Sequence, residues 1–189
     1  MQTSWIVSVI LVAIVLYAVV VYNRLVRQRN QVREGWSGID VQLRRRTDLV
    51  PNLVETVKAY AAHERGLFEE VTARRAASIA AQDISHQATA ERALGGALGR
   101  LFALAEGYPE LKADQNFRKL QDQLAEIEDQ LQMARRYYNG TVRNLNISIQ
   151  SFPNTLIAGP LGFREEPYFE LDDARAGVAP TIEFQSARP

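Results

Sequence analysis

The feature that most constrains this sequence is a long apolar run near its N-terminus. From Trp5 to Tyr22 the chain reads WIVSVILVAIVLYAVVVY, with one serine as its only strongly polar residue, and no charged side chain precedes Arg24. As a helix at about 1.5 Å per residue, this run spans roughly 27 Å, close to the roughly 30 Å hydrocarbon core of a bilayer. We therefore predict a transmembrane helix over 5–22, after a short flank of residues 1–4, with Trp5 and Tyr22 at its interfacial ends.

A cleaved signal peptide would carry a positive first region and a small-residue cleavage site. The chain instead begins MQTSW and leaves the apolar run through VVVYNR. A buried core helix is seldom so uniformly apolar. We therefore expect an uncleaved, single-pass anchor.

The charges that flank the apolar run predict its orientation. Its C-terminal flank carries Arg24, Arg27, Arg29 and Arg33 against only Glu34. Because positive flanks stay inside, we expect the N-terminus outside and the following domain in the cytoplasm. The same four arginines are candidates for contact with anionic lipid headgroups.

Heptad spacing of apolar residues predicts a helical bundle over residues 23–150. The first helix leaves the membrane with two stripes, in which Leu25, Val32 and Ile39 alternate with Trp36, Leu43 and Val50. Pro51 lacks the N–H that a helix interior needs, so we expect a break or kink at residues 47–50.

Three further helices are predicted, over about 52–79, about 89–106 and from about Phe117 to residue 150, the last interrupted only by Gly140. Short connections favour antiparallel neighbours, so the expected fold is all-α: an up-and-down four-helix bundle. Residues 151–189 hold five of the seven prolines but also many apolar residues. We expect this segment to form an irregular strap packed on the bundle, frayed at its end.

The sequence is poor in catalytic and ligand-binding groups. It has no cysteine, and neither His63 nor His86 has a partner at metal-ligand spacing. Glu-x-x-His pairs and a glycine-rich phosphate loop are also missing. We expect no enzyme activity, no catalytic or metal-binding residue and no cofactor. The formal net charge is zero, which gives no case for nucleic-acid binding.

The densest polar stretch falls at the expected turn between the first two helices. It contains five candidate residues, Arg45, Arg46, Asp48, Asn52 and Glu55. Two interpretations stay open: these residues pair and cap to hold the turn, or they form a surface that docks a partner protein.

Five long motifs stand in the sequence: WSGIDVQLRRRTDLVPNLVETVKAY (36–60), AEGYPELKA (105–113), NFRKLQ (116–121), ARRYYNGTV (134–142) and SFPNTLIA (151–158). They closely resemble motifs of the LemA family, occur in the family's order and extend over nearly the whole chain. Two positions depart from the family pattern: Thr47 stands where an aromatic residue is usual, and Gly107 where asparagine is common.

The resemblance implies a bacterial inner-membrane protein with one anchor and an up-and-down bundle. It carries over no catalytic residue. It also implies partnership with other membrane proteins, a membrane protease or a membrane-associated repair module among them.

We expect a non-enzymatic scaffold or adaptor for other membrane proteins. One alternative is a small-ligand sensor, with a site lined by Tyr60, Tyr108, Tyr137 and Tyr138. Another is a membrane- or lipid-organising protein that acts through its basic stalk. Self-association into a homo-oligomer is also left open.

Overall fold

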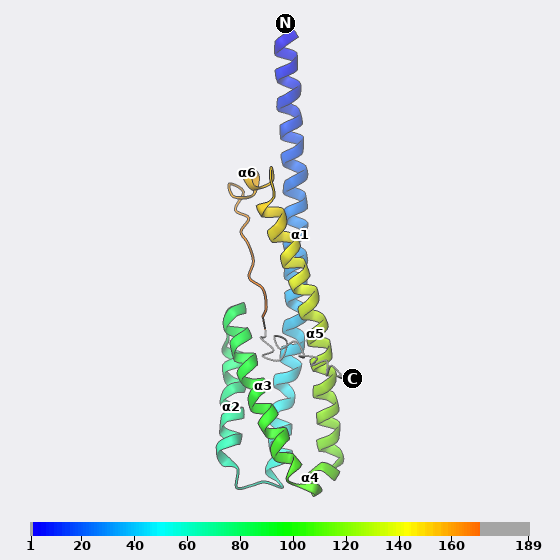
Figure 1. The fold of residues 1–189 in the computed structure, drawn as a ribbon, viewed down its shortest axis with the longest axis vertical. Helices are drawn as coiled ribbons and strands as arrows, with labels where there is room; N and C mark the ends of the chain where they lie inside the picture. Colours follow the sequence, from blue (N-terminus) through cyan, green and yellow to red (C-terminus); the bar gives the residue numbers. More distant parts are fainter. Residues whose placement is uncertain (1, 171–189) are drawn as a thin grey trace, which may run out of the picture.

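The computed structural model describes residues 2–170, in which every regular element is a helix. Figure 1 shows α1 as one long helix, with α2, α3 and α4 near its C-terminal part, α5 alongside it and α6 beside it farther toward the N-terminus. The elements are α1 (Gln2–Lys58), α2 (Arg65–Ala80), α3 (Ile84–Glu106), α4 (Pro109–Ala113), α5 (Gln115–Gln150) and α6 (Thr155–Ala158). The predicted all-α fold, with an N-terminal helix continuing into an up-and-down bundle, is confirmed.

The first part of α1 projects beyond the bundle (Figure 1). Its best 18-residue window has a mean hydropathy of 2.8 and is only 6% buried. Among the described residues, α1 is the one helix long and apolar enough to cross a membrane. The structure thus fits a membrane protein, and the direction of insertion stays a prediction.

The predicted break at residues 47–50 is wrong, because α1 runs through Pro51 to Lys58. A proline inside a helix leaves the carbonyl four residues earlier without its N–H partner. That carbonyl belongs to Thr47, and here it accepts a hydrogen bond of 2.7 Å from Nε of Arg75 in α2. A side chain from the neighbouring helix therefore replaces the bond that Pro51 cannot make.

Burial also favours continuation of α1 past the proline. The residues on its inner face around this point are at most 1% exposed: Val50, Leu53 and Val57. A proline in a helix interior costs roughly 3 kcal/mol, whereas each fully buried aliphatic side chain contributes roughly 1.5–3 kcal/mol. Packing therefore outweighs the local preference for a break, and the turn lies after Lys58 instead.

The remaining helix boundaries differ from the sequence-based prediction in two places. Residues 52–58 belong to α1, so α2 begins only at Arg65. Helix α3 begins at Ile84, ahead of the predicted start near 89, because the Asp83 side chain accepts a hydrogen bond from the N–H of His86 and caps it. Helix α5 passes through Gly140 without interruption.

The described residues bury two hydrophobic clusters, one at each end of the bundle. The membrane-far cluster joins the end of α1 to α2, α3, α4 and the start of α5. The membrane-near cluster joins the middle of α1 to α5, to the start of α3 and to the segment after α5. In this second cluster Gly35 lets the two long helices approach closely, since a Cβ there would lie 3.1 Å from Cα of Tyr138.

The strap after α5 is irregular and packs on the bundle as far as it is described, to residue 170; the rest of the predicted strap lies outside the described residues. Two α5 asparagines hold it. The Asn146 amide exchanges two hydrogen bonds of 2.9 Å with the backbone of Glu166, and Asn139 exchanges two of 2.9 and 3.1 Å with that of Phe169.

The spacing of these two asparagines explains how the strap follows the helix. Seven helical residues rise roughly 10 Å, and three extended residues rise about the same distance. Asn146 and Asn139 therefore match Glu166 and Phe169 in register, with the strap antiparallel to α5. Both asparagines also lie in Asn-x-Ser/Thr patterns, the sequence pattern of N-glycosylation sites. In the structure their side chains instead hydrogen-bond the backbone of the strap.

Aromatic rings fasten the end of the described strap. The Phe169 ring lies 5.6 Å from that of Trp36, which in turn lies 5.7 Å from that of Tyr138, both in edge-on geometry. The Tyr138 hydroxyl donates to the carbonyl of Pro167 at 2.8 Å. Burial raises the pKa of Tyr138 above its ordinary value, because the charged phenolate would lose its hydration.

Candidate functional site

The candidate segment from Arg45 to Glu55 lies within α1 rather than at a turn. The expectation that these residues hold a turn is therefore wrong. Four of them, Arg45, Asp48, Asn52 and Glu55, are exposed. Their spacing of three, four and three residues places them on one face of the helix. Their role in docking stays a prediction.

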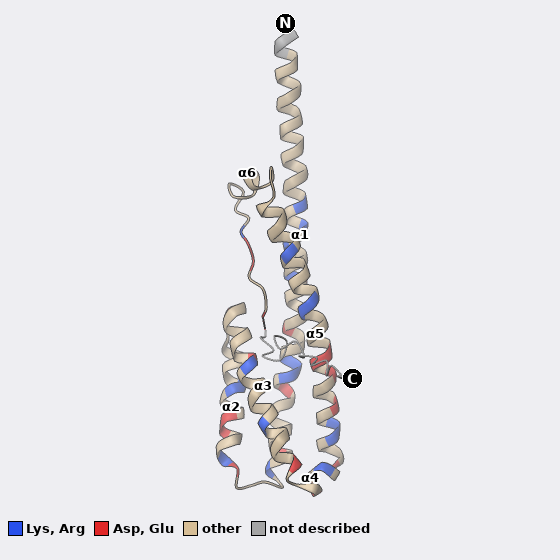
Figure 2. Ribbon diagram, viewed as in Figure 1, with Lys and Arg blue, Asp and Glu red and all other residues tan. Residues whose placement is uncertain are grey.

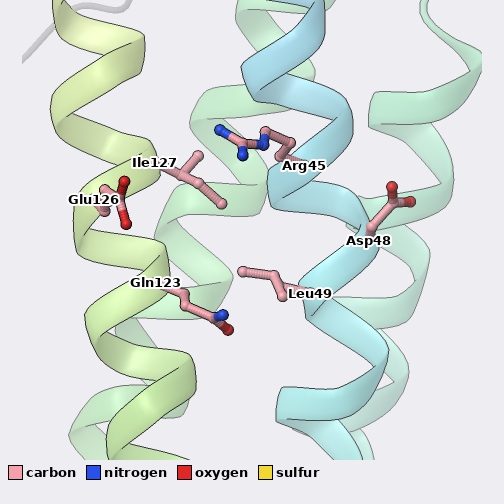
Figure 3. A pocket seen from close by; sticks show the side chains of 6 residues that line it. All are labelled: Arg45, Asp48, Leu49, Gln123, Glu126 and Ile127. Atoms are coloured by element: carbon pink, nitrogen blue, oxygen red, sulfur yellow. The ribbon is translucent and has the colours of Figure 1, made fainter.

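Part of this face borders an open groove between α1 and α5 (Figure 3). Leu49 and Ile127 point toward one another between the two helices and form an apolar floor. Arg45 of α1 and Glu126 of α5 stand at its rim, and Asp48 points away from α5. An apolar floor with charges of both signs at the rim resembles a protein-docking surface more than a closed small-molecule cavity.

The fifth candidate, Arg46, points into the bundle and is only 8% exposed. Its guanidinium lies 3.2 Å from Oε2 of Glu91 in α3 and 3.5 Å from Oε2 of Glu128 in α5. Glu91 is 1% exposed and also accepts hydrogen bonds from Ser78 of α2 and, at 3.1 Å, from Gln87 of α3. These residues form a buried polar layer that connects all four long helices.

The buried polar layer lies between the two hydrophobic clusters. Burying an ion pair is costly unless its lone pairs and protons are satisfied, and here three donors surround the Glu91 carboxylate. Gly95 makes room for the pair, because a Cβ there would lie 3.2 Å from a guanidinium nitrogen of Arg46.

Sequence reasoning missed Glu91, Ser78 and Gln87, although a signal for the first was present. Glu91 falls three, seven and ten residues before the inward-facing leucines of α3, which are Leu94, Leu98 and Leu101. A charged residue in an apolar stripe predicts a buried partner of opposite charge. Ser78 and Gln87 carry no such signal, because polar residues of this size are common on helix surfaces.

The described residues offer no other chemical centre of a familiar kind. Within residues 2–170, no group of three or more His, Cys, Asp and Glu side chains could hold a metal ion. The four tyrosines of the sensor alternative do not share a site either. Tyr60 is exposed and donates at 3.1 Å to Asp114, whereas Tyr138 is buried against the strap.

Asp114 caps the N-terminus of α5, and its side-chain hydrogen bonds match that role. The backbone N–H of Phe117 donates to it at 2.9 Å, and this bond, together with that from Tyr60, lowers the pKa of the Asp114 carboxyl below its usual 3.8. The same hydrogen bond with the Asp114 carboxylate raises the pKa of Tyr60. Capping explains this pair fully.

The predicted membrane-facing residues lie at the other end of the molecule. Arg24, Arg27 and Arg33 are exposed, whereas Arg29 is half-buried with its guanidinium 5.0 Å from the centre of the Phe163 ring. Trp5 and Tyr22, at the ends of the predicted span, are 76% and 44% exposed. Their contacts with lipid stay predictions.

Comparison with known proteins places this chain in a family. The model of the LemA family matches residues 35–184. Two similar proteins are the magnetosome proteins MamQ 1 and MamQ 2 of Paramagnetospirillum magneticum, each 26% identical over an alignment of 204 residues that covers 94% of this chain and 74% of theirs. Magnetosome protein MamQ of Magnetospirillum gryphiswaldense is 25% identical over an alignment of 209 residues that covers 96% of this chain and 76% of that protein. Because the family match spans most of the chain, including the groove, the buried polar layer and the asparagine pair, this protein belongs to the LemA family.

Proposed function

We propose that this LemA-family protein is a non-enzymatic, membrane-anchored adaptor that docks another protein in the α1–α5 groove. The observation that carries the proposal is the continuity of α1. One helix begins in the apolar segment, crosses both hydrophobic clusters and supplies one wall of the groove. The groove is therefore held at a set height above the bilayer by an unbroken helix.

That height limits the kind of partner. Arg45 follows Tyr22 by 23 residues, which correspond to roughly 35 Å of helix. At this distance the groove reaches neither headgroups nor a transmembrane segment. The partner we propose is a soluble protein, or the domain of a membrane protein that extends from the bilayer, on the cytoplasmic side given by the arginine-rich flank.

The groove favours an adaptor over an enzyme or a sensor. Its floor is apolar, its rim carries Arg45 on α1 and Glu126 on α5, and it is an open groove rather than an enclosed cavity. Burial of an apolar centre within a charged rim is how protein interfaces gain affinity and orientation.

Charge reversal at the rim tests the proposal. Full-length tagged protein is crosslinked in its native membrane, and the captured proteins are compared with those of an Arg45→Glu, Glu126→Lys variant. Both residues are exposed, so the fold should be kept, and helix content measured by circular dichroism checks this. We expect a specific captured protein to be lost.

Arg136→Glu is the matched control, since Arg136 is exposed on α5 but lies outside the groove. The control should keep the partner that the groove variant loses. Capture of the same proteins by the groove variant, the control and the unchanged protein would show that the groove docks nothing.

A further inference from the structure

The first part of the segment after α5 lies beside the membrane anchor, before the strap returns along the bundle. Residues 151–163, which we name the knob, surround the short helix α6. The Tyr17 hydroxyl donates a hydrogen bond of 2.9 Å to Oδ1 of Asn154, and the rings of Tyr22 and Phe163 lie 5.8 Å apart in edge-on geometry. Both tyrosines belong to the predicted transmembrane run, so the knob stands level with its end.

The knob is folded, yet it exposes large apolar side chains. Ala158 and Phe163 are 0% and 5% exposed and belong to the membrane-near cluster. Phe152, Leu156 and Leu161 are 80%, 66% and 47% exposed. Single exposed leucines are ordinary on a protein surface. Three large exposed apolar residues within ten positions, on a folded element beside a membrane anchor, instead indicate a surface that contacts another apolar phase or protein.

Charge is distributed as a membrane surface would require. No charged residue occurs from Asn144 to Phe163, and this uncharged run is bounded by Arg143 and Arg164. Figure 2 shows the knob lying beside the uncharged part of α1, on the N-terminal side of the first charged residues of that helix. The first of these is Arg24, and the first charged residue after the knob is Arg164. The two arginines therefore mark the same end of the uncharged region.

We propose that the knob is a second membrane-contact element, which inserts Phe152, Leu156 and Leu161 into the interface of the bilayer that holds the α1 anchor. Tyr17 lies five residues inside the apolar run from Tyr22, about 7 Å along the helix. Elements that lie in the interface bury their apolar side chains to a similar depth, roughly 5–10 Å into the boundary between headgroups and acyl chains.

Interfacial depth also suits the backbone of the knob. Its turns leave some backbone N–H and C=O groups without a partner in the protein. Such groups are costly in the hydrocarbon core, but water hydrogen-bonds them in the headgroup region. Elements that lie in this layer place apolar side chains among the upper acyl chains and flank them with basic residues. With two attachments, the anchor and the knob, the bundle has a set tilt and rotation above the bilayer.

The absence of cysteine allows a direct test, because any introduced thiol is unique. Full-length Leu156→Cys and Ile79→Cys variants are labelled with the environment-sensitive dye NBD and reconstituted in phosphatidylcholine–phosphatidylglycerol vesicles. Ile79 is the matched control, being an apolar residue of α2 that is 59% exposed and lies in the bundle. The vesicles are prepared with and without lipids that carry a doxyl quencher high on the acyl chain.

We expect NBD at position 156 to emit at shorter wavelength than NBD at position 79 and to be strongly quenched by the doxyl lipid. Position 79 should show neither effect. Equal, unquenched emission from both positions would overturn the proposal. A blue shift at position 156 without lipid quenching would also overturn it, since a second copy of the chain or another protein would then cover the knob. Circular dichroism of each labelled variant confirms that the helices are kept.

Discussion

Removing the arginine of the buried polar layer should destabilise this protein far more than removing its exposed neighbour. In an Arg46→Met variant, Glu91 keeps its 1% exposure and its bonds from Ser78 and Gln87 but loses the cation 3.2 Å away. Methionine fills similar space without charge. The change in unfolding free energy of this variant therefore reports the cost of burying the Glu91 carboxylate without its cation.

The expected loss is large compared with the whole stability of a domain. Breaking a buried ion pair by removing one partner costs about 3–5 kcal/mol. We expect the lower end, about 3 kcal/mol, because two neutral donors still face the Glu91 carboxylate. Domains of this kind are stable by only about 5–15 kcal/mol, so such a loss removes a large fraction.

Replacing both partners should restore most of that stability. In an Arg46→Met, Glu91→Leu variant no charge is left buried, and apolar replacements of ion pairs are often neutral or stabilising. Glu128 is half-exposed and stays solvated after Arg46 is removed. We expect the double variant to lie within about 1 kcal/mol of the unchanged protein, with a correspondingly large coupling energy.

Urea unfolding of the full-length protein in detergent, followed by circular dichroism, measures these differences. The control is Arg44→Met, because Arg44 is exposed and pairs only at the surface with Asp40, at 3.0 Å. Exposed pairs contribute about 0–1 kcal/mol. If Arg46→Met costs no more than Arg44→Met, or if the double variant is less stable than Arg46→Met alone, the buried layer does not act as an ion pair and the reasoning is refuted.

Three further predictions concern other parts of the fold. Asn139→Ala should release the strap and make its backbone open to protease, whereas Asn144→Ala, whose side chain is exposed, should leave cleavage unchanged; equal cleavage of the two would contradict the register of the strap. Gly35→Leu should destabilise the protein to urea by about 1–3 kcal/mol, because α5 leaves no space, while Gly38→Ala, where space is open, should stabilise it by up to about 1 kcal/mol. The folded-state pKa of Asp114 is lowered, so its contribution to stability is present above the ordinary value of 3.8 and is lost as pH falls through the folded-state value. In an Asp114→Asn variant, the free energy of unfolding measured with urea should therefore fall less steeply as pH is lowered through the acid range. An unchanged pH dependence would show that the charge of the cap contributes nothing to stability.

Local pattern was sufficient for much of this molecule. The apolar run of α1 and the heptads of α5 are each long enough for periodicity alone to predict a helix and its buried face. Phe117, Leu124, Leu131 and Tyr138 are all buried as their seven-residue spacing indicates. Such stripes are reliable because many residues contribute to each and a single exception does not change the outcome.

The errors arose where one residue was interpreted without its neighbours in space. Pro51 predicts a break by itself, but Arg75, from a helix that is adjacent only after folding, supplies the missing donor. Arg46 and Glu91 lie far apart in the sequence, and only the packing of α1 against α3 makes them one ion pair.

The sequence by itself was sufficient to predict an apolar membrane segment and helices with defined inner faces. Only the tertiary structure decided which polar residues face inward, where α1 ends, and that the segment after α5 returns to the level of the anchor. The physical reason is the distance along the sequence over which each interaction acts. Helix periodicity and hydropathy are properties of contiguous residues, whereas ion pairs, replaced hydrogen bonds and the position of the knob depend on groups that folding brings together.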